Sequence, residues 1–339
     1  MSDAVGRIMQ VGLGFWPSKV LLTAVEFDLF TVLGAGPQTG EELRARLGWH
    51  ARGVHDFLDS LVALGFLERE GDGPGARYRN GPDAAAHLDK RQPGYMGGIL
   101  EMANARLFRY WADLGEAMRT GQPQTEIKHR GESIFAELYK DPDKLRQFVD
   151  AMTGLSGFNF RKLAEVFDFS RYGTLCDVGG AGADLSISAA RRHPRLRCIS
   201  FDLAPVEPIA KARIAAAGLG DRIRTATGDF FEDPLPKADV ITMGMILHDW
   251  NLERKQALVR AAYAALPAGG AFIAVEALID DARRKNVMGL MMSLNMLIEF
   301  GEAFDYTAAD FQGWCRAAGF RRFEVLPLVG PSSAAVAYK

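Results

Sequence analysis

The first eighty residues show the apolar spacing of short helices followed by a hairpin. Apolar positions recur every three or four residues over 20–34 and 51–65, and Thr39 begins a capping box for a helix between them. Two short strand-like runs, 66–70 and 76–80, flank a glycine-rich turn. Helices followed by such a hairpin are typical of a winged-helix domain, so DNA binding has to be considered.

The rest of the chain shows a second pattern. Residues 91–168 have helical spacing, and from residue 174 onward apolar strand-like runs alternate with helix-like segments. This alternation predicts a doubly wound parallel sheet of the α/β class. The last two runs are too close in sequence for a crossover, so we expect them to pair antiparallel. The predicted strands are 174–180, 197–203, 223–230, 239–247, 271–279, 320–329 and 334–339.

Composition and charge narrow the class of protein. The 339 residues exceed one comfortable core, and 48% of them are hydrophobic and 24% charged, as in globular proteins. A net charge of −2, with no long apolar run and no signal-peptide pattern, predicts no nucleic-acid or membrane partner. Cys176, Cys198 and Cys315 lack metal-ligand spacing, and their odd number favours a reducing, cytoplasmic location.

Local charge argues against DNA binding by the hairpin-bearing domain. Between Thr39 and Asn80 there are six basic and seven acidic residues. The helix that would enter the major groove carries Arg52 but also Asp56 and Asp59, which phosphates would repel. We therefore expect this domain to bind protein rather than DNA.

A glycine-rich turn follows the first predicted strand of the sheet. Asp177 precedes Gly179, Gly180 and Gly182, and glycines let the backbone turn sharply and approach a ligand. As a dinucleotide fingerprint the turn is incomplete, because Leu185 stands where the third glycine belongs. Asp177 would repel a pyrophosphate, whereas S-adenosylmethionine (SAM) carries an ammonium and a sulfonium and no phosphate. The turn therefore favours SAM over a nicotinamide dinucleotide.

Acidic residues also stand at the ends of the next two strands. Asp202 can accept hydrogen bonds from a ribose diol. Asp229 followed by Phe230 suits an adenine, with a hydrogen bond to its amino group and stacking on its face. Because the carboxyl ends of parallel strands meet at one edge of the sheet, these residues trace one ligand across it.

The fourth strand leads into His248, Asp249 and Trp250 beside the predicted cofactor. A phenol, with a pKa of about 10, is a poor nucleophile while protonated, and a neutral imidazole can remove its proton during attack. His248 is therefore predicted to be a general base. Asp249 is a weaker candidate for the base, because Asp249 or Asn251 is expected to cap the following helix.

The motifs Asp-Val-Gly-Gly, Phe-Asp-Leu, Gly-Asp-Phe-Phe and Ile-Leu-His-Asp-Trp, in this order, resemble the small-molecule O-methyltransferases of the caffeic acid and hydroxyindole type, bacterial members included. The resemblance spans nearly the whole chain. It implies a winged-helix dimerisation domain over 1–100 and a seven-stranded Rossmann-like methyltransferase domain over 101–339, with a helical substrate-pocket segment at 101–168. It also implies SAM as cofactor and a homodimer in which N-terminal helices help to close the partner's pocket.

The resemblance assigns roles to single residues. His248 matches the catalytic base, and Glu276 and Asp305 match the carboxylates that orient it, with Glu299 and Glu302 as competitors for the second position. The expected cofactor contacts are Gly179, Asp202, Asp229, Phe230 and Met243, together with the neighbouring Asp177, Gly180 and Gly182.

Two positions depart from the family pattern near the cofactor. Ala181 replaces a usual glycine, which is tolerable while its backbone keeps a normal φ. Gly244 stands where plant members carry a lysine, so one charged contact is absent.

The acceptor pocket is predicted from a methionine stripe and from the neighbours of His248. Met288, Met291, Met292 and Met296 recur at helical spacing, which fits either a core-facing stripe or the wall of a pocket. The expected substrate contacts are Met296, Met292, Asp249 and Trp250, with Trp111, Phe108 and Met152 as candidates for the opposite wall.

These patterns together predict a SAM-dependent O-methyltransferase that acts on a hydroxyl of a small aromatic molecule and needs no metal. An N- or C-methyltransferase, or a non-methylating SAM-dependent enzyme on the same fold, remains open. A SAM-sensing winged-helix regulator is the alternative from another class, and a nicotinamide oxidoreductase is the third.

Overall fold

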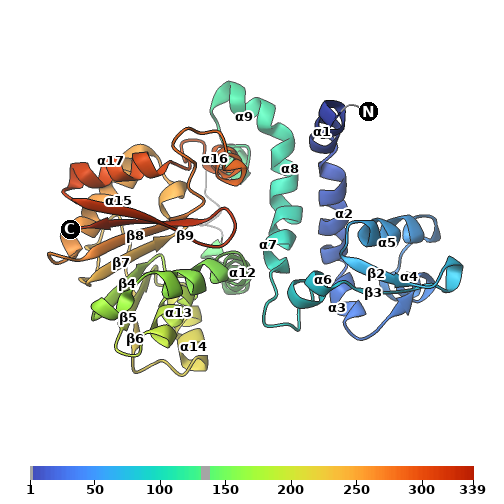
Figure 1. Cartoon of the computed structure of the whole chain (residues 1–339), viewed down its shortest axis with the longest axis horizontal. Coiled ribbons are helices and arrows are strands. Elements are labelled where there is room, and N and C mark those ends of the chain that lie inside the picture. The colour runs from blue at the N-terminus through green and yellow to red at the C-terminus, as the bar shows by residue number, and fades with distance from the viewer. Residues whose placement is uncertain (1–2, 131–137) are drawn as a thin grey trace. The chain divides into compact units, whose positions relative to one another are not determined.

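The computed structural model describes residues 3–130 and 138–339 (Figure 1). Their contacts divide the chain into two compact units, Met1–Arg109 and Tyr110–Lys339, which we describe separately. Among the described residues no single helix is both long and apolar enough to cross a membrane. A bent pair, Asp3–Gly12 with Phe15–Glu26, meets those criteria by length and composition alone.

The N-terminal unit combines short helices with an antiparallel sheet in the order β1 (Gln38–Thr39), β3 (Arg77–Asn80), β2 (Leu67–Glu70). The predicted capping box is present. Thr39 Oγ1 accepts from the Glu42 N–H at 3.2 Å, and the Glu42 carboxylate accepts from the Thr39 N–H at 2.7 Å. The helices of this unit are α1 (Asp3–Gly12), α2 (Phe15–Glu26), α3 (Leu29–Leu33), α4 (Gly40–Leu47), α5 (Val54–Ala63), α6 (Pro82–His87) and α7 (Gly97–Met102), with α8 (Phe108–Tyr110) at its end.

The helix expected over 20–34 is broken into α2 and α3. Asp28 separates them with a left-handed backbone conformation, φ +55°. Aspartate adopts this conformation more readily than most residues, because its short side chain can bond locally. The two helices still share one buried cluster with α5 and the hairpin, which includes Leu29, Leu58 and Tyr78.

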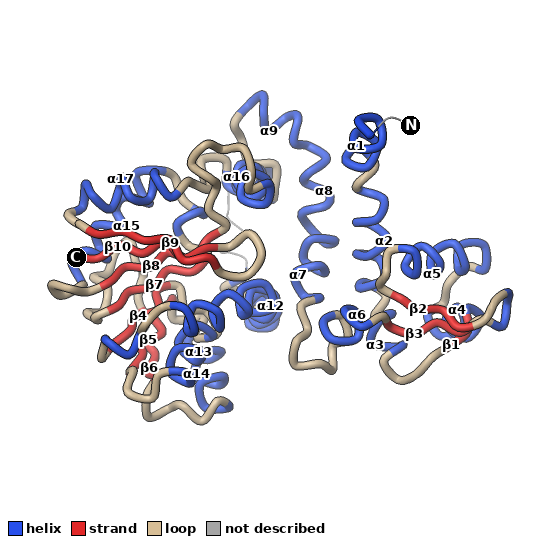
Figure 2. The backbone as a smooth tube through the Cα atoms, in the orientation of Figure 1, coloured by secondary structure: helices blue, strands red, loops and turns tan. Residues whose placement is uncertain are grey.

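The C-terminal unit is built on a seven-stranded sheet in the order β6-β5-β4-β7-β8-β10-β9 (Figure 2). Strands β4 to β8 are parallel, and β10 runs antiparallel to both β8 and β9. The predicted doubly wound α/β sheet is therefore confirmed. Its strands are β4 (Thr174–Val178), β5 (Arg197–Asp202), β6 (Ile223–Thr227), β7 (Val240–Gly244), β8 (Ala271–Glu276), β9 (Arg322–Pro327) and β10 (Ser333–Tyr338).

Helices pack against both faces of this sheet because its central strands are apolar on both sides. One buried cluster joins Phe272 of β8 to Leu258 and Phe311 on one face. The other joins Leu175 of β4 to Leu185 on the opposite face. The helices are α9 (Leu114–Thr120), α10 (Glu126–Arg130), α12 (Pro142–Val166), α13 (Asp184–Arg192), α14 (Glu207–Ala216), α15 (Leu252–Ala265), α16 (Val287–Phe300) and α17 (Ala308–Ala318).

The strand order reverses between β4 and β7, which are neighbours in the sheet. In open α/β sheets, ligands bind at the carboxyl ends of the strands beside such a reversal. The turn after β4, the end of β5 and the short helix η6 (Leu247–Asp249) after β7 all lie at those ends. The topology therefore assembles the predicted motifs at one edge of the sheet.

Candidate active site

The turn after β4 requires a glycine at its first position. Gly179 has φ +68°, and a Cβ there would lie 2.3 Å from Cδ1 of Ile246. Its N–H donates to the Phe201 carbonyl at 2.9 Å, which ties the turn to β5. Any other residue would be strained and would also collide with Ile246.

Gly180 and Gly182 allow close packing inside the protein. A Cβ would lie 2.4 Å from Oγ of Ser200 at the first position and 2.3 Å from Nη1 of Arg213 at the second. Arg213 in turn donates to Asp184 at 2.7 Å and so links α14 to α13. These two glycines have a packing role that does not depend on a ligand.

Ala181 does not keep the ordinary backbone conformation that would make alanine easy to accommodate. Its φ is +44°, and that of Ala183 is +62°. The condition under which alanine is easily tolerated at this position, a normal φ, is therefore not met. The turn adopts this conformation while the Ala181 N–H donates to Oδ2 of Asp202 at 2.8 Å. A left-handed L-residue costs about 1–2 kcal/mol, which the surrounding contacts must offset.

Asp202, at the end of β5, keeps capacity for further hydrogen bonds. Its two oxygens accept from the backbone N–H groups of Ala181 and, at 2.7 Å, Leu203. Burial raises its pKa, and the two backbone donors oppose that rise. An ionised carboxylate has about four lone-pair sites, so this one can also accept from the hydroxyls of a ribose.

Tyr139 was not identified from the sequence, and its hydroxyl lies in the field of three carboxylates at this end of the sheet. Burial raises the pKa of its hydroxyl, and the charges of Asp202, Asp249 and Asp229 raise it further. Its ring packs against the cluster that includes Val206. This acidic region fits a ligand with positive charge and hydroxyl groups, as SAM has, better than one with a pyrophosphate.

Two expected cofactor contacts lie deeper than the resemblance implies. Asp177 is 4% exposed and accepts from Thr242 Oγ1 at 2.9 Å, and burial raises its pKa to about 7. Met243 is fully buried. At Gly244 a Cβ would lie 2.8 Å from the ring of Phe160, which therefore occupies the space where a side chain would begin.

An aromatic cluster connects the end of β6 to the turn that carries His248. The rings of Phe230 and Phe231 are 4.8 Å apart, and those of Phe231 and Trp250 are 4.6 Å apart, both in edge-to-face geometry. The Arg254 guanidinium lies 4.7 Å from the Phe231 ring centroid and 5.0 Å from that of Trp250. Asp229 accepts from the Phe231 N–H at 2.9 Å. Trp250 thus lies on the adenine side of the predicted site as well as beside His248.

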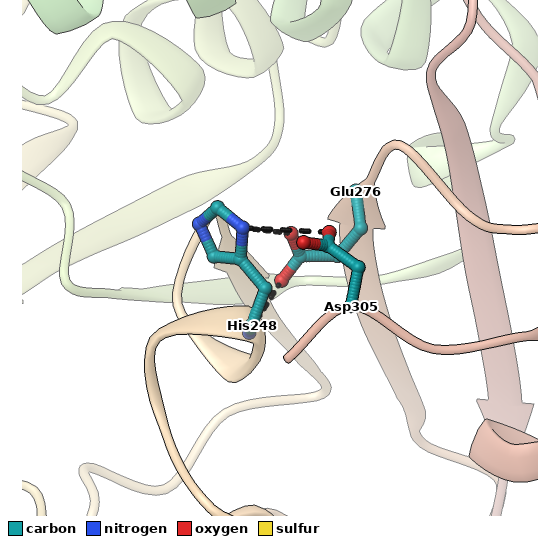
Figure 3. Close-up of side chains that lie close together, drawn as sticks. All are labelled: His248, Glu276 and Asp305. Carbon is teal, nitrogen blue, oxygen red and sulfur yellow. Dashed lines mark hydrogen bonds and ion pairs between the residues drawn. The ribbon is translucent and has the colours of Figure 1, made fainter. Parts of the chain in front are cut away.

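His248 is buried between carboxylates from three elements. Figure 3 shows the Nδ1 edge of its ring facing Asp305 and Glu276, at 3.4 Å from Asp305 Oδ1 and 3.8 Å from Glu276 Oε2. The other oxygen of Glu276 lies 3.4 Å from the backbone N–H of His248. On the opposite edge of the ring, Nε2 lies 3.3 Å from Oδ1 of Asp249.

The geometry distinguishes among the three candidates for the second carboxylate. Asp305, 2% exposed, lies beside the imidazole. Glu302 accepts from Nδ2 of Asn251 at 2.9 Å, and Glu299 accepts from Nδ2 of Asn295 at 2.7 Å. Only Asp305 of these three contacts His248 among the described ion pairs.

The N-cap of α15 is Asn251, whose side chain accepts from the Arg254 N–H at 3.1 Å. Asp249 is therefore not needed as a cap, and the reason for discounting it as a base does not hold. Burial raises the pKa of Asp249 to about 6, against the effect of His248, which lowers it. In either protonation state, Asp249 can accept a hydrogen bond from a group that lies near Nε2 of His248.

The electrostatics of this cluster favour a protonated imidazole. Burial lowers the pKa of His248, but the charges of Glu276, Asp249 and Asp305 outweigh it, and the net pKa lies above its usual value. Burial raises the pKa of Glu276 to about 7, which His248 opposes. Each carboxylate near the ring stabilises the charge that the imidazole gains when it accepts a proton.

The same residues also have the spacing of a metal site, which the sequence did not suggest. One donor atom each from His248, Glu276 and Asp305 lies within 4.8 Å of the others. Carboxylate–imidazole groupings that orient a base and those that hold a metal share this geometry. Chelation of metal ions would distinguish a cluster that orients a base from one that holds a metal.

The methionines of α16 differ in their exposure to solvent, from the surface of the protein to its core. Met288 and Met291 are 52% and 45% exposed, whereas Met296 is 4% exposed. Beside Met296, Asn295 accepts from Nε1 of Trp111 at 2.9 Å. The structure therefore bonds Trp111 to the methionine-bearing helix itself, whereas Trp111 was a candidate for the opposite wall, and the outer methionines lie at the surface.

Comparisons with known proteins agree with this fold. A family model described as the O-methyltransferase domain matches residues 111–321, and one described as the O-methyltransferase dimerisation domain matches residues 9–90. The chain belongs to the O-methyltransferase family, and its methyl donor is SAM. The resemblance and the enzyme class predicted from the sequence are both confirmed.

Two relatives and one solved structure illustrate the match. The chain is 42% identical to tetracenomycin polyketide synthesis 8-O-methyl transferase TcmO of Streptomyces glaucescens, over 98% of this chain and 96% of the relative. It is 34% identical to N,N-dimethyltransferase OxyT of Streptomyces rimosus, over 93% and 90%. The crystal structure of human N-acetylserotonin methyltransferase in complex with SAM superposes with a TM-score of 0.91 at 28% identity, covering 100% of this chain and 98% of the other.

Proposed function

We propose that His248 is the general base that removes a proton from an acceptor hydroxyl. The single observation that supports it best is the burial of His248 among Asp305, Glu276 and Asp249, after the carboxyl end of β7. Nδ1 faces two carboxylates that can hold its proton and fix the tautomer. Nε2 is then the atom that accepts the proton of the substrate.

The charge balance of the transfer follows from these contacts. SAM, when bound, would supply an electrophilic methyl group on a positively charged sulfur, and that sulfur would keep the electron pair of the broken S–C bond and become neutral. As the acceptor oxygen gains its bond to carbon, its O–H bond breaks and the proton passes to Nε2 of His248. The resulting imidazolium is stabilised by Glu276 and Asp305, which need not be protonated themselves. Positioning and exclusion of water account for most of the remaining acceleration.

We further propose that SAM contacts Asp202 and Tyr139 near its ribose and Asp229 and Phe230 near its adenine. The free acceptor capacity of Asp202 and the half-buried position of Asp229 support this placement.

The proposed acceptor is a phenolic hydroxyl on a fused aromatic molecule. Relatives named for such substrates support it, among them TcmO and the 3-hydroxy-5-methyl-1-naphthoate 3-O-methyltransferase of Streptomyces sahachiroi, 34% identical. Met292 and Met296 on α16, with Trp111 bonded to that helix, offer the flat apolar contacts that a ring needs. Asp249 would accept a hydrogen bond from the hydroxyl of the methyl-accepting molecule.

A nitrogen acceptor is the second candidate, because OxyT is named an N,N-dimethyltransferase. An amine that is neutral attacks without a base of the strength a phenol requires. The presence of His248 with its carboxylates therefore favours oxygen.

A homodimer formed through the N-terminal unit is also proposed. The dimerisation-domain match and the apolar side chains of the first two helices support it, with Ile8 69%, Val11 76% and Trp16 58% exposed. Such exposure on a monomer marks a surface that a partner covers.

The three cysteines are free and buried, which supports a reducing, cytoplasmic location.

One experiment tests the acceptor chemistry. The enzyme is incubated with SAM and with matched pairs of polycyclic phenols and aryl amines, and the methylated atom is identified by NMR of the product. We expect O-methylation of phenols and none of the amines. Methylation of the amines alone would contradict the proposal.

A further inference from the structure

Arg213 on α14 bonds to two other helices through its guanidinium. Its Nη1 donates to Oδ2 of Asp184 on α13 at 2.7 Å and to Oγ1 of Thr153 on α12 at 2.6 Å. Its Nη2 donates to Asp150, about one turn earlier on α12. The Thr153 hydroxyl donates to Oδ2 of Asp184 at 2.6 Å. We call these four residues, Arg213, Asp184, Thr153 and Asp150, the α12 latch.

The centre of the latch is shielded from water. The side chains of Arg213 and Asp184 are 23% and 24% exposed. Hydrogen bonds between a guanidinium and a carboxylate are charge-assisted and directional, so they fix the helices that carry them. Lys211, on the same helix as Arg213, pairs with Glu207 but is 61% exposed, and pairs of that kind contribute little.

The latch lies against the turn that is predicted to receive SAM. A Cβ at Gly182 would lie 2.3 Å from Nη1 of Arg213, so the guanidinium packs directly on the glycine turn. Asp184 is the first residue of α13, immediately after that turn. The N–H of Ala181, on the other side of Gly182, donates to Asp202 at 2.8 Å. The latch and the proposed ribose site therefore share one short stretch of backbone, residues 181–184.

A buried apolar cluster beside the latch joins α12 to the start of α14. Its members are Leu145, Val149, Val206 and Ile209, with Ala181 and Tyr139 packed against them. Val149 and Thr153 are about one helical turn apart, so the latch fixes the stretch of α12 that packs beside the glycine turn. The position of α12 therefore determines how Tyr139 and Ala181 lie relative to each other.

We propose that Arg213 is a positioning residue for SAM binding, which holds the N-terminal half of α12 on the glycine turn. The proposal rests on the placement of SAM beside Asp202 and Tyr139, because α12 and the turn then form one wall of the cofactor site. Arg213 acts through α12 and not through a contact with SAM. Without the latch, SAM binding has to order α12, and the cost of that ordering reduces the affinity.

Removing Arg213 has opposite effects on SAM binding through position and through charge. SAM carries a net positive charge, so loss of a nearby cation by itself would favour its binding. We expect R213M instead to weaken SAM binding about tenfold, as for the loss of one charge-assisted hydrogen bond, with kcat at saturating SAM unchanged. K211M is the matched control and is expected to keep the wild-type dissociation constant. Isothermal titration provides the comparison. A dissociation constant for R213M at or below the wild-type value overturns the proposal.

Variants on α12 separate the latch from a purely local role of Arg213 beside the turn. T153V and D150N remove bonds to α12 and leave the bond between Arg213 and Asp184 in place. Valine has nearly the shape of threonine, so T153V is expected to fold even if R213M does not. We expect T153V/D150N to weaken SAM binding as R213M does. If T153V/D150N binds SAM like the wild type, Arg213 does not act through α12 and the proposal fails.

Hydrogen exchange measures α12 without catalysis. In the protein without cofactor, amides of residues 144–153 are expected to exchange faster in R213M than in the wild type or K211M, and SAH is expected to slow them. Equal exchange in R213M and the wild type overturns the latch. D202N tests the placement of SAM separately. Wild-type SAM affinity in D202N would overturn that placement, whereas weak binding in D202N with wild-type binding in R213M overturns the role of Arg213 alone.

Discussion

The Nδ1 atom of His248 lies 3.4 Å from Oδ1 of Asp305, a residue of the loop that joins α16 to α17. The family resemblance left Asp305 in competition with Glu299 and Glu302. Glu299 on α16 bonds to Asn295 and Glu302 on the loop bonds to Asn251, so Asp305 is the one of the three that lies beside the imidazole.

Removing either carboxylate that faces Nδ1 should lower activity. D305N and E276Q are expected to reduce kcat by about 10- to 100-fold, because the imidazolium and its tautomer lose their support. E302Q is the matched control, since Glu302 bonds to the cap residue Asn251 and not to His248. Steady-state kinetics at saturating SAM provide the comparison. Equal losses in D305N and E302Q would contradict the assignment.

The same carboxylates should set the pH dependence. The folded-state pKa of His248 is raised, so the neutral base forms only above its ordinary value of 6.5. We therefore expect kcat/KM to increase as the pH rises through the neutral range. It should decrease again as the pH falls through the raised pKa of His248. A profile that stays flat down to pH of about 6 would show that no such base limits the reaction.

Bound SAM should change this titration through its charge. A sulfonium held near the cluster disfavours a second positive charge on the imidazole, whereas the neutral sulfur of SAH does not. The His248 midpoint, followed by NMR, is expected to be lower in the SAM complex than in the SAH complex. Equal midpoints would place the sulfur too far from His248 for direct proton removal.

Part of the fold and of the candidate site could be anticipated from the sequence, and part could not. The apolar runs of β4, β5, β7 and β8 are unmistakable because buried parallel strands have few polar residues. The conformation of Ala181 was not visible, because the left-handed φ accompanies a hydrogen bond to Asp202, which is distant in sequence.

Lys255 and Tyr139 were missed for a related reason. In a helical pattern a lysine is assigned to the solvent side, and only the packing of α15 against Phe304 shows that this one is buried. Tyr139 lies in a segment whose spacing predicts helix without indicating which carboxylates it will meet. Met243 was expected at the cofactor by analogy; its side chain is fully buried, and its contact with the cofactor stays a prediction.

The glycine turn gives a prediction for cofactor binding. G179A should weaken SAM binding at least about tenfold, because the new Cβ is strained at φ +68° and meets Ile246. G218A is the control. Gly218 has nearly the same φ, +67°, with open space around its Cβ, so only stability should fall, by about 1 kcal/mol. Isothermal titration with SAM and thermal unfolding separate the two effects.

Chelation decides between the two functions that the His248 cluster could serve. If Glu276 and Asp305 orient a base, dialysis against EDTA leaves kcat unchanged and added Zn²⁺ or Mg²⁺ does not raise it. Loss of activity on chelation, with recovery on adding one metal, would identify the cluster as a metal site instead.

The role of His248 is tested most directly by single-turnover methylation in H248A with SAM already bound. We expect a dissociation constant for SAM close to that of the wild type. We also expect a methyl-transfer rate constant lower by about 10²- to 10⁴-fold, the usual contribution of a general base. A wild-type rate constant in H248A, with SAM fully bound, would contradict it.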